Sequence, residues 1–222
     1  MKYFRDHILL SVLCAVLWIA LLLMPVVTPI FKSSNVQFII DPGHGLPDGG
    51  SVATDGTTEQ LLNLQIASEL YSLFPEGSAV LSRTDEQSLS QIQGAIREMK
   101  VSDMKQRVAL AKQYKDAILI SVHMNAFPNS SVYGCQVFYR NYDEKSHQIA
   151  LRLQAEINQS LQPDHTKTCK PIEDSLYLFK NTENPAILIE CGFLSNPSDL
   201  AKLKNSDFQK QLALLIYTAV QQ

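Results

Sequence analysis

Cysteine is scarce in this chain of 222 residues, and no two cysteines have Cys-X-X-Cys spacing. Four cysteines are too few for a disulfide framework. Cys14 lies in an apolar N-terminal run, so only Cys135, Cys169 and Cys191 remain, an odd set that allows at most one bridge. We interpret Cys135 and Cys191 as small buried residues of strands.

A basic excess is also missing. The formal net charge is −3, and removing residues 1–32 would remove three basic residues and only one acidic residue. A nucleic-acid-binding domain would show a basic stripe, so the sequence argues against a nucleic-acid partner. An anionic polymer would have to be bound through local contacts, because overall charge would not attract it. No internal repeat or low-complexity tract is visible, and 45% apolar and 18% charged residues are ordinary for a globular domain.

The N-terminal run is the longest stretch without charge. It covers Ile8–Phe31, with prolines at 25 and 29. At about 1.5 Å per residue, even the proline-free part approaches the roughly 30 Å apolar thickness of a bilayer. A cleaved signal peptide and a buried core helix are the alternatives. The run is longer than a usual signal-peptide core and no A-x-A-like cleavage site follows it, so we predict an uncleaved transmembrane anchor.

Basic residues precede this run, since Lys2 and Arg5 lie before Ile8. The positive-inside rule then predicts an extracytoplasmic location for the rest of the chain. We therefore divide the sequence into a membrane anchor with a short linker, residues 1–34, and one globular domain, residues 35–222.

Apolar strand patterns alternate with helical patterns through the globular domain, which predicts an α/β fold. We expect a single domain with a mostly parallel central sheet flanked by helices on both faces, preceded by one transmembrane helix. The predicted strands cover residues 36–40, 79–81, 117–122, 134–139 and 185–190. The predicted helices cover 59–74, 88–114 and 143–160, with a short helix opened by Asn196-Pro197 and a final helix after 206.

Two pairs of polar residues suggest where helices begin. Thr57 with Gln60, and Ser206 with Gln209, have the spacing of capping boxes. The segment 101–103 is expected to cap a second helix within 88–114.

Ionisable residues follow three of the predicted strands. His44 comes after the first strand, His123 after the third, and Glu190 after the last, while Glu59 opens the first helix. If the strands are parallel, these side chains converge at one edge of the sheet. Two histidines and one carboxylate with a free fourth position form the ligand set of a catalytic zinc, and a second carboxylate off the metal is the usual general base.

Each of these residues alone also has a structural interpretation. His123 could be a satisfied core histidine, Glu59 a charge favoured by the helix dipole, and Glu190 an ion-pair partner. The other histidines are weaker candidates for metal ligands. His7 precedes the anchor, His147 falls off the apolar face of its helix and should be solvated, and His165 lies in a polar loop.

Three segments together resemble the zinc-dependent N-acetylmuramoyl-L-alanine amidases of the amidase type 3 family. They are Asp41–Gly45 followed by Glu59, then Ser121–Ala126, and then Pro185–Pro197. The resemblance covers nearly all of residues 36–222. It implies cleavage of the bond between N-acetylmuramic acid and the L-alanine of the stem peptide. It further implies that His44, Glu59 and His123 bind Zn²⁺ and that Glu190 is the catalytic carboxylate.

The short anchored form looks most like the spore-cortex branch of that family, which prepares cortex peptidoglycan for muramic-δ-lactam formation and germination. The implied partners are peptidoglycan glycan strands and stem peptides, the membrane through the anchor, and an activator protein. Leu46 is a departure, because the family usually has a second glycine there. Asp41 is expected either to support the metal site from behind or to bind its own turn. Arg83 and Arg107 match recurrent positions, and we assign them no role from the sequence.

Three other functions are open to a chain of this kind. A zinc peptidase of similar fold would act on wall peptides with the same ligands. A non-catalytic glycan-binding module would not need Glu59, His123 and Glu190 together, and an inactive scaffold would tend to have lost a ligand.

Overall fold

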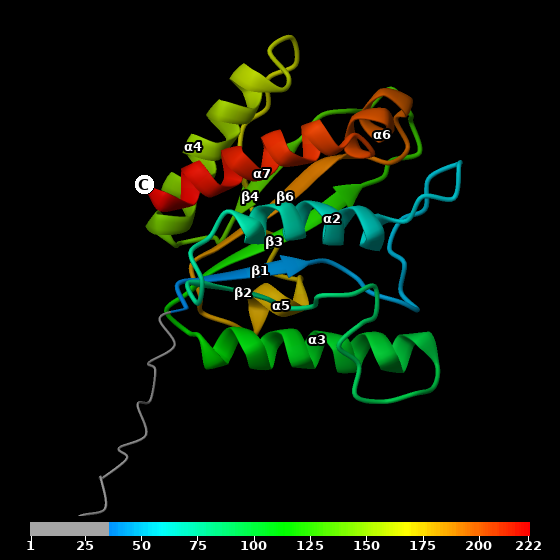
Figure 1. The fold of residues 1–222 in the computed structure, drawn as a ribbon, viewed down its shortest axis with the longest axis vertical. Helices are drawn as coiled ribbons and strands as arrows, with labels where there is room; N and C mark the ends of the chain where they lie inside the picture. The colour runs from blue at the N-terminus through cyan, green and yellow to red at the C-terminus, as the bar shows by residue number, and fades with distance from the viewer. Residues whose placement is uncertain (1–35) are drawn as a thin grey trace, which may run out of the picture. The chain divides into compact units, whose positions relative to one another are not determined.

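The structure is a computed structural model, and it describes residues 36–222 (Figure 1). The predicted anchor and linker, residues 1–34, lie outside the described residues, so the anchor stays a prediction. Within residues 36–222, no helix has both the length and the apolar character needed to span a bilayer.

Six strands form one sheet in the order β2-β1-β3-β6-β4-β5 (Figure 1). Strands β2, β1, β3 and β6 are mutually parallel, whereas β4 runs antiparallel to β6 and β5 runs parallel to β4. The prediction of a mostly parallel α/β sheet is therefore confirmed. The strands are β1 (Phe38–Pro42), β2 (Ala79–Leu81), β3 (Ile118–Asn125), β4 (Gln136–Tyr139), β5 (Lys170–Pro171) and β6 (Ala186–Phe193).

Helices cover both faces of this sheet, as predicted. Helices α2, α4 and α7 lie on one face, and α3 and α5 lie on the other (Figure 1). The helices are α2 (Glu59–Ser72), α3 (Ile96–Gln113), α4 (Glu144–Ser160), α5 (Tyr177–Lys180), α6 (Pro197–Leu203) and α7 (Ser206–Gln221).

The central strands are apolar in sequence because both of their faces are buried. Alternate residues serve two cores: Ile40 and Ile120 pack under α2, α4 and α7, whereas Ile39 and Leu119 pack against α3 and α5. Burial on both sides fixes the register of these strands, and the register in turn fixes which residues reach the sheet edge.

Two predicted helix starts are confirmed, whereas the two predicted capping boxes are each displaced by one residue from the observed cap position. The side chain of Asp143 caps α4 by accepting from the N–H of Ser146, and Asn196 caps α6. Asn205, not Ser206, caps α7, because its side chain accepts from the backbone N–H groups of residues 207 and 208. Helix α2 begins after Thr58, which makes no side-chain cap, so the predicted box at Thr57 is absent.

The predicted helix over 88–114 begins only at residue 96, and it continues without a break to 113. Ser102 and Asp103 do not cap a second helix. Their side chains accept from the backbone N–H groups of Gln91 and Leu89, at 3.0 and 2.7 Å. These residues therefore hold the preceding loop against α3. Polar side chains that accept from backbone N–H groups are also typical of helix caps, so the sequence pattern looked like a helix start.

The strands that carry His123 and Glu190 are longer than predicted. Strand β3 continues to Asn125 and β6 to Phe193, so both ionisable residues lie within the last part of a strand and not after it. The same strand, β6, contains Cys191, and Cys135 lies directly before β4. Both cysteines are buried, as predicted, and all three cysteines of the described residues are free thiols.

Candidate metal centre

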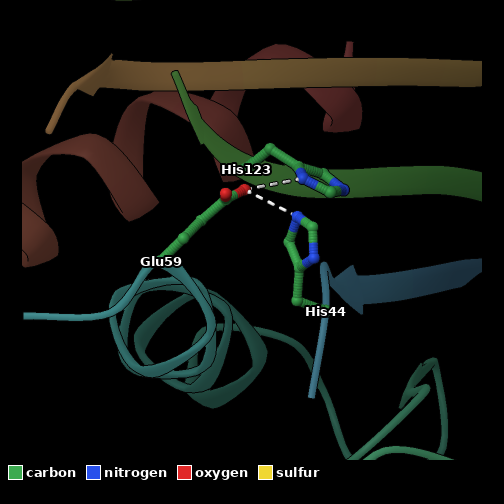
Figure 2. A group of neighbouring side chains, drawn as sticks. All are labelled: His44, Glu59 and His123. Atoms are coloured by element: carbon green, nitrogen blue, oxygen red, sulfur yellow. Dashed lines mark hydrogen bonds and ion pairs between the residues drawn. The ribbon is translucent and has the colours of Figure 1, made fainter. Parts of the chain in front are cut away.

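Three side chains converge at the carboxyl ends of β1 and β3 (Figure 2). His44 comes from the loop after β1, Glu59 is the first residue of α2, and His123 is on β3. The Oε1 atom of Glu59 lies 3.1 Å from Nε2 of His44 and 2.9 Å from Nδ1 of His123. One ligand atom from each residue lies within 4.8 Å of the others. The structure thus brings together the three residues that the sequence singled out as ligands.

The donor set fits a metal cation. Two imidazole nitrogens and one carboxylate oxygen are the protein ligands of many catalytic zinc sites, which keep a fourth position open. Burial alone would raise the pKa of Glu59, but the neighbouring His123 and His44 lower it far below its usual range. Glu59 is therefore an anion between two imidazoles, the arrangement that a divalent cation needs.

His44 is held in one orientation by its other ring nitrogen. Nδ1 lies 3.0 Å from a carboxylate oxygen of Asp48, which leaves Nε2 facing Glu59. Burial would lower the pKa of His44, but Asp48 and Glu59 together raise it to about 9. A carboxylate behind a ligand histidine is the usual way to fix its tautomer and strengthen it as a donor. The sequence analysis missed this role of Asp48, although its spacing of four residues from His44 was a signal.

Glycines allow the ligands to approach one another. A Cβ on Gly43 would lie 2.2 Å from the His123 ring, and one on Gly50 would lie 2.6 Å from Oε2 of Glu59. Gly50 also has a φ of +67°, which favours glycine. Leu46, which departs from the family pattern, is tied to the segment 86–88 through its N–H and its carbonyl.

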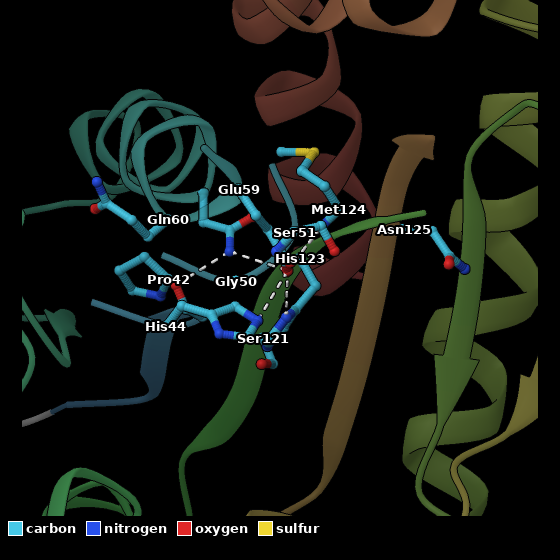
Figure 3. Close-up of polar contacts among 12 residues, drawn as sticks. Pro42, His44, Gly50, Ser51, Glu59, Gln60, Ser121, His123, Met124 and Asn125 are labelled. Atoms are coloured by element: carbon cyan, nitrogen blue, oxygen red, sulfur yellow. Dashed lines mark hydrogen bonds and ion pairs between the residues drawn. The ribbon is translucent and has the colours of Figure 1, made fainter. Parts of the chain in front are cut away.

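Backbone groups also hold the Glu59 carboxylate (Figure 3). The N–H of Ser51 donates to Oε2 at 2.9 Å, and the N–H of Met124 donates to Oε1 at 3.2 Å. Because these donors are fixed by the main chain, the carboxylate is already placed where a metal would bind it.

Glu190 lies beside this cluster but is not part of it. It is paired in register with His123 across β3 and β6, so both side chains point to the same face of the sheet. Its Oε2 atom is buried and has no hydrogen-bond partner among the described residues. Burial raises the pKa of Glu190, and the charge of Glu59 adds to this effect, although His123 and His44 oppose it. A carboxylate of this kind is available to a reacting group.

A cleft of about 290 Å³ opens next to these residues. His44, His123 and Glu190 line it, and so does Lys100, whose Nζ lies 2.9 Å from the Asp48 carboxylate. The rest of the lining is largely apolar. It includes Met104, Leu176, Tyr177, Leu178, Phe179 and Leu188.

Asp41 does not bind its own turn, and it reaches the His44 loop only through Arg107, which also donates to the His44 carbonyl. It is buried, and it pairs with Arg107 and accepts from the hydroxyls of Ser82 and Ser121, at 2.6 and 3.2 Å. Burial would raise the pKa of Asp41, but Arg107 and the Ser82 hydroxyl outweigh burial and lower it. Asp41 is thus the counter-ion of a buried arginine beneath the His44 loop.

The other histidines do not join the cluster. His147 is half-buried and stacks on Tyr139, with 4.4 Å between ring centroids, so the prediction that it is solvated is wrong in part. His165 stacks on Tyr133 at 4.2 Å. His7 lies outside the described residues.

Residues 38–222 match the N-acetylmuramoyl-L-alanine amidase family. The chain belongs to this family. Among its curated relatives, it is 32% identical over 184 residues to a germination-specific N-acetylmuramoyl-L-alanine amidase of Bacillus subtilis, covering 82% of this chain and 76% of the relative.

Solved structures of amidases share the fold. The CwlD amidase of Clostridioides difficile, solved in complex with the GerS lipoprotein, has a TM-score of 0.78 at 31% identity, over 83% of this chain and 95% of that one. An N-acetylmuramoyl-L-alanine amidase of Clostridium difficile 630 has a TM-score of 0.70 at 31% identity, over 84% and 96%.

The predicted activity is therefore confirmed. This amidase is a peptidoglycan hydrolase that cleaves the amide bond between N-acetylmuramic acid and L-alanine. The family match favours this activity over a zinc peptidase, a glycan-binding module or an inactive scaffold.

Proposed function

We propose that the amidase uses one Zn²⁺ per chain, bound by His44, Glu59 and His123, and that Glu190 is its general base. One observation carries this proposal: three ligand atoms lie within 4.8 Å of one another beside a cleft that also contains a buried, unpartnered oxygen of Glu190. Glu59 is unsuited to proton transfer because both histidines hold it as an anion.

Amide hydrolysis needs a stronger electrophile and a stronger nucleophile than an amide and water provide at neutral pH. Zinc held by His44, Glu59 and His123 would supply both, because it would polarise the amide carbonyl and lower the pKa of a bound water to about 7. Glu190 accepts the proton of the attacking water and delivers it to the leaving nitrogen of L-alanine. Burial raises the pKa of Glu190, which makes it a stronger base than an exposed carboxylate.

The cleft suits a substrate with both apolar and polar parts. Its lining combines the proposed ligands His44 and His123 with apolar residues that include Leu176. We propose that the stem peptide and the muramyl group bind in this cleft, with the scissile amide next to His44 and Glu190. Since the chain is acidic overall, such binding depends on these local contacts and not on long-range attraction.

A role in spore-cortex maturation is supported by the similarity to a germination-specific amidase and to CwlD. Removal of the stem peptide is required before a muramic acid can form a δ-lactam. We expect spores of a strain that lacks this chain to contain cortex without muramic-δ-lactam, and reintroduction of the wild-type chain, but not of Glu190→Gln, to restore it. Analysis of cortex muropeptides by mass spectrometry measures this. Normal lactam content in the deletion strain would contradict the cortex role.

An accessory protein is a further proposed partner. The related CwlD amidase was solved in complex with a lipoprotein, GerS. If this chain depends on an activator of that kind, the purified amidase should hydrolyse peptidoglycan slowly until the activator is added. Full activity of the purified chain alone would argue against such dependence.

The N-terminal anchor is proposed from the sequence alone, on the uncharged run Ile8–Phe31. We expect protease added to intact protoplasts to degrade the amidase domain, because the domain should lie outside the cytoplasm. N-terminal sequencing of the mature protein should find the original N-terminus. Recovery of a soluble form that begins near residue 33 would instead indicate a cleaved signal peptide.

A further inference from the structure

We propose that Arg83 is a positioning residue of the metal centre. Its guanidinium joins the loop that carries His44 to the first turn of the helix that carries Glu59, and thereby sets the affinity of the site for its metal. This role rests on the proposed zinc site, but no family resemblance or comparison assigns it.

The side chain of Arg83 is buried and donates only to main-chain carbonyls. Its Nη2 donates to the carbonyls of Gly43 and Gln60, at 2.9 and 2.8 Å. Its Nε donates to the carbonyl of Pro42 at 3.1 Å, and its Nη1 to that of Asp85 at 2.7 Å. No carboxylate forms an ion pair with Arg83 among residues 36–222. The guanidinium therefore acts as a fixed connector between segments of main chain.

The two segments joined by Nη2 are the ones that carry metal ligands. Gly43 immediately precedes His44, and Gln60 immediately follows Glu59. A single nitrogen bonded to both carbonyls fixes the distance between the two ligands. Asn63 reinforces the link from α2, because its side-chain amide donates to the same Gly43 carbonyl at 3.0 Å.

The His44 loop needs such support. His44 has a φ of 60°, in the left-handed region that residues other than glycine seldom adopt. A conformation of this kind persists only where the surrounding structure holds it, and such positions cluster at functional sites. The carbonyls on the N-terminal side of His44 are bound by buried side chains, which is the support expected.

Arg107 also binds this loop, but in a different electrostatic setting. It donates to the carbonyls of Pro42 and His44, and it forms ion pairs with Asp41 and with Asp103. Removing Arg107 would leave two buried carboxylates without a counter-ion, so its loss would lower the stability of the whole domain. Arg83 is free of this complication, which makes it the residue to test.

Lysine cannot replace the Arg83 fork. It keeps the charge, but its single ammonium cannot reach carbonyls in four directions. Residues that orient metal ligands typically contribute about 10–100-fold to metal affinity. We therefore expect Arg83→Lys to raise the zinc dissociation constant by about that factor.

The experiment uses the full-length chain in detergent and measures two quantities for each variant. The first is the zinc dissociation constant, from competition with a chromophoric chelator, and the second is the Tm of the metal-free protein. Arg140→Lys is the matched control. Arg140 also donates to two main-chain carbonyls and a hydroxyl, those of Asn184, Phe179 and Thr182, and none of them adjoins a proposed ligand.

Both variants should lose Tm, but only Arg83→Lys should lose zinc affinity. Equal zinc affinity in the wild type, Arg83→Lys and Arg140→Lys would overturn the proposal and leave the metal centre intact. A wild-type chain that binds no zinc would contradict the metal centre itself, and this role with it.

Asn63→Leu tests the same link if Arg83→Lys does not fold. It removes the hydrogen bond to the Gly43 carbonyl, together with the 3.5 Å contact between Asn63 Nδ2 and Oε1 of Glu59, while keeping the branched shape of the side chain. It should also weaken zinc binding, but by a smaller factor than Arg83→Lys, which disrupts four hydrogen bonds. Unchanged zinc affinity in folded Asn63→Leu would count against the link in the same way.

Discussion

Glu190→Gln is expected to lower the rate of amide hydrolysis by about 10²–10⁴-fold or more, because general acid–base catalysis typically contributes that much. Glutamine has the size of glutamate and keeps its hydrogen-bonding reach, but it cannot accept a proton from water. Glu190 is not part of the ligand cluster, so the zinc content and the Tm of the variant should stay near those of the wild type. The release of stem peptides from peptidoglycan measures the rate of hydrolysis. Zinc analysis of the same preparation measures the metal content.

Glu59→Gln is the matched control for this result. Glu59 bridges both histidines through Oε1, so its loss should weaken zinc binding as well as activity. If Glu190→Gln lost its zinc while Glu59→Gln kept it, the two carboxylates would have to exchange roles. The reaction class would survive that result, but the proposed assignment of base and ligand would not.

His44→Ala and His123→Ala should each lose most of the bound zinc, and the hydrolytic activity with it. Each variant removes one of only three protein ligands, and a two-ligand site holds a cation weakly. Metal analysis after gel filtration measures the loss. His147→Ala and His165→Ala are the controls and should keep one zinc per chain, since these rings stack on tyrosines away from the cluster. Full zinc occupancy in the double variant His44→Ala/His123→Ala would mean that the metal binds elsewhere.

The convergence of the ligands could be predicted because it follows from local patterns and one topological rule. Apolar runs identified β1, β3 and β6, and parallel strands bring their carboxyl ends to one edge of a sheet. His123 and Glu190 are in fact paired residues of adjacent strands. A strand pattern and a polar residue near its end were sufficient to predict that these two side chains lie together. This holds even though both strands continue further than predicted.

Features that depend on distant contacts could not be predicted in this way. The reversed direction of β4 is set by its pairing with β6, and nothing in the local pattern of residues 134–139 indicates it. Arg83 lies 41 and 40 positions from Pro42 and Gly43, whose carbonyls it binds. Every residue has a main-chain carbonyl, so the sequence does not show which ones a side chain will bind. The polar residues Ser102 and Asp103 misled the prediction because a side chain that binds loop N–H groups resembles a helix cap.

The central claim, that this cleft hydrolyses the bond between N-acetylmuramic acid and L-alanine, is tested most directly by mass spectrometry of peptidoglycan digested with the purified amidase. We predict free stem peptides that begin with L-alanine, together with glycan strands whose muramic acid has a free lactyl carboxylate. Peptides cleaved between two amino acids, with L-alanine still attached to muramic acid, would contradict the claim and indicate a peptidase.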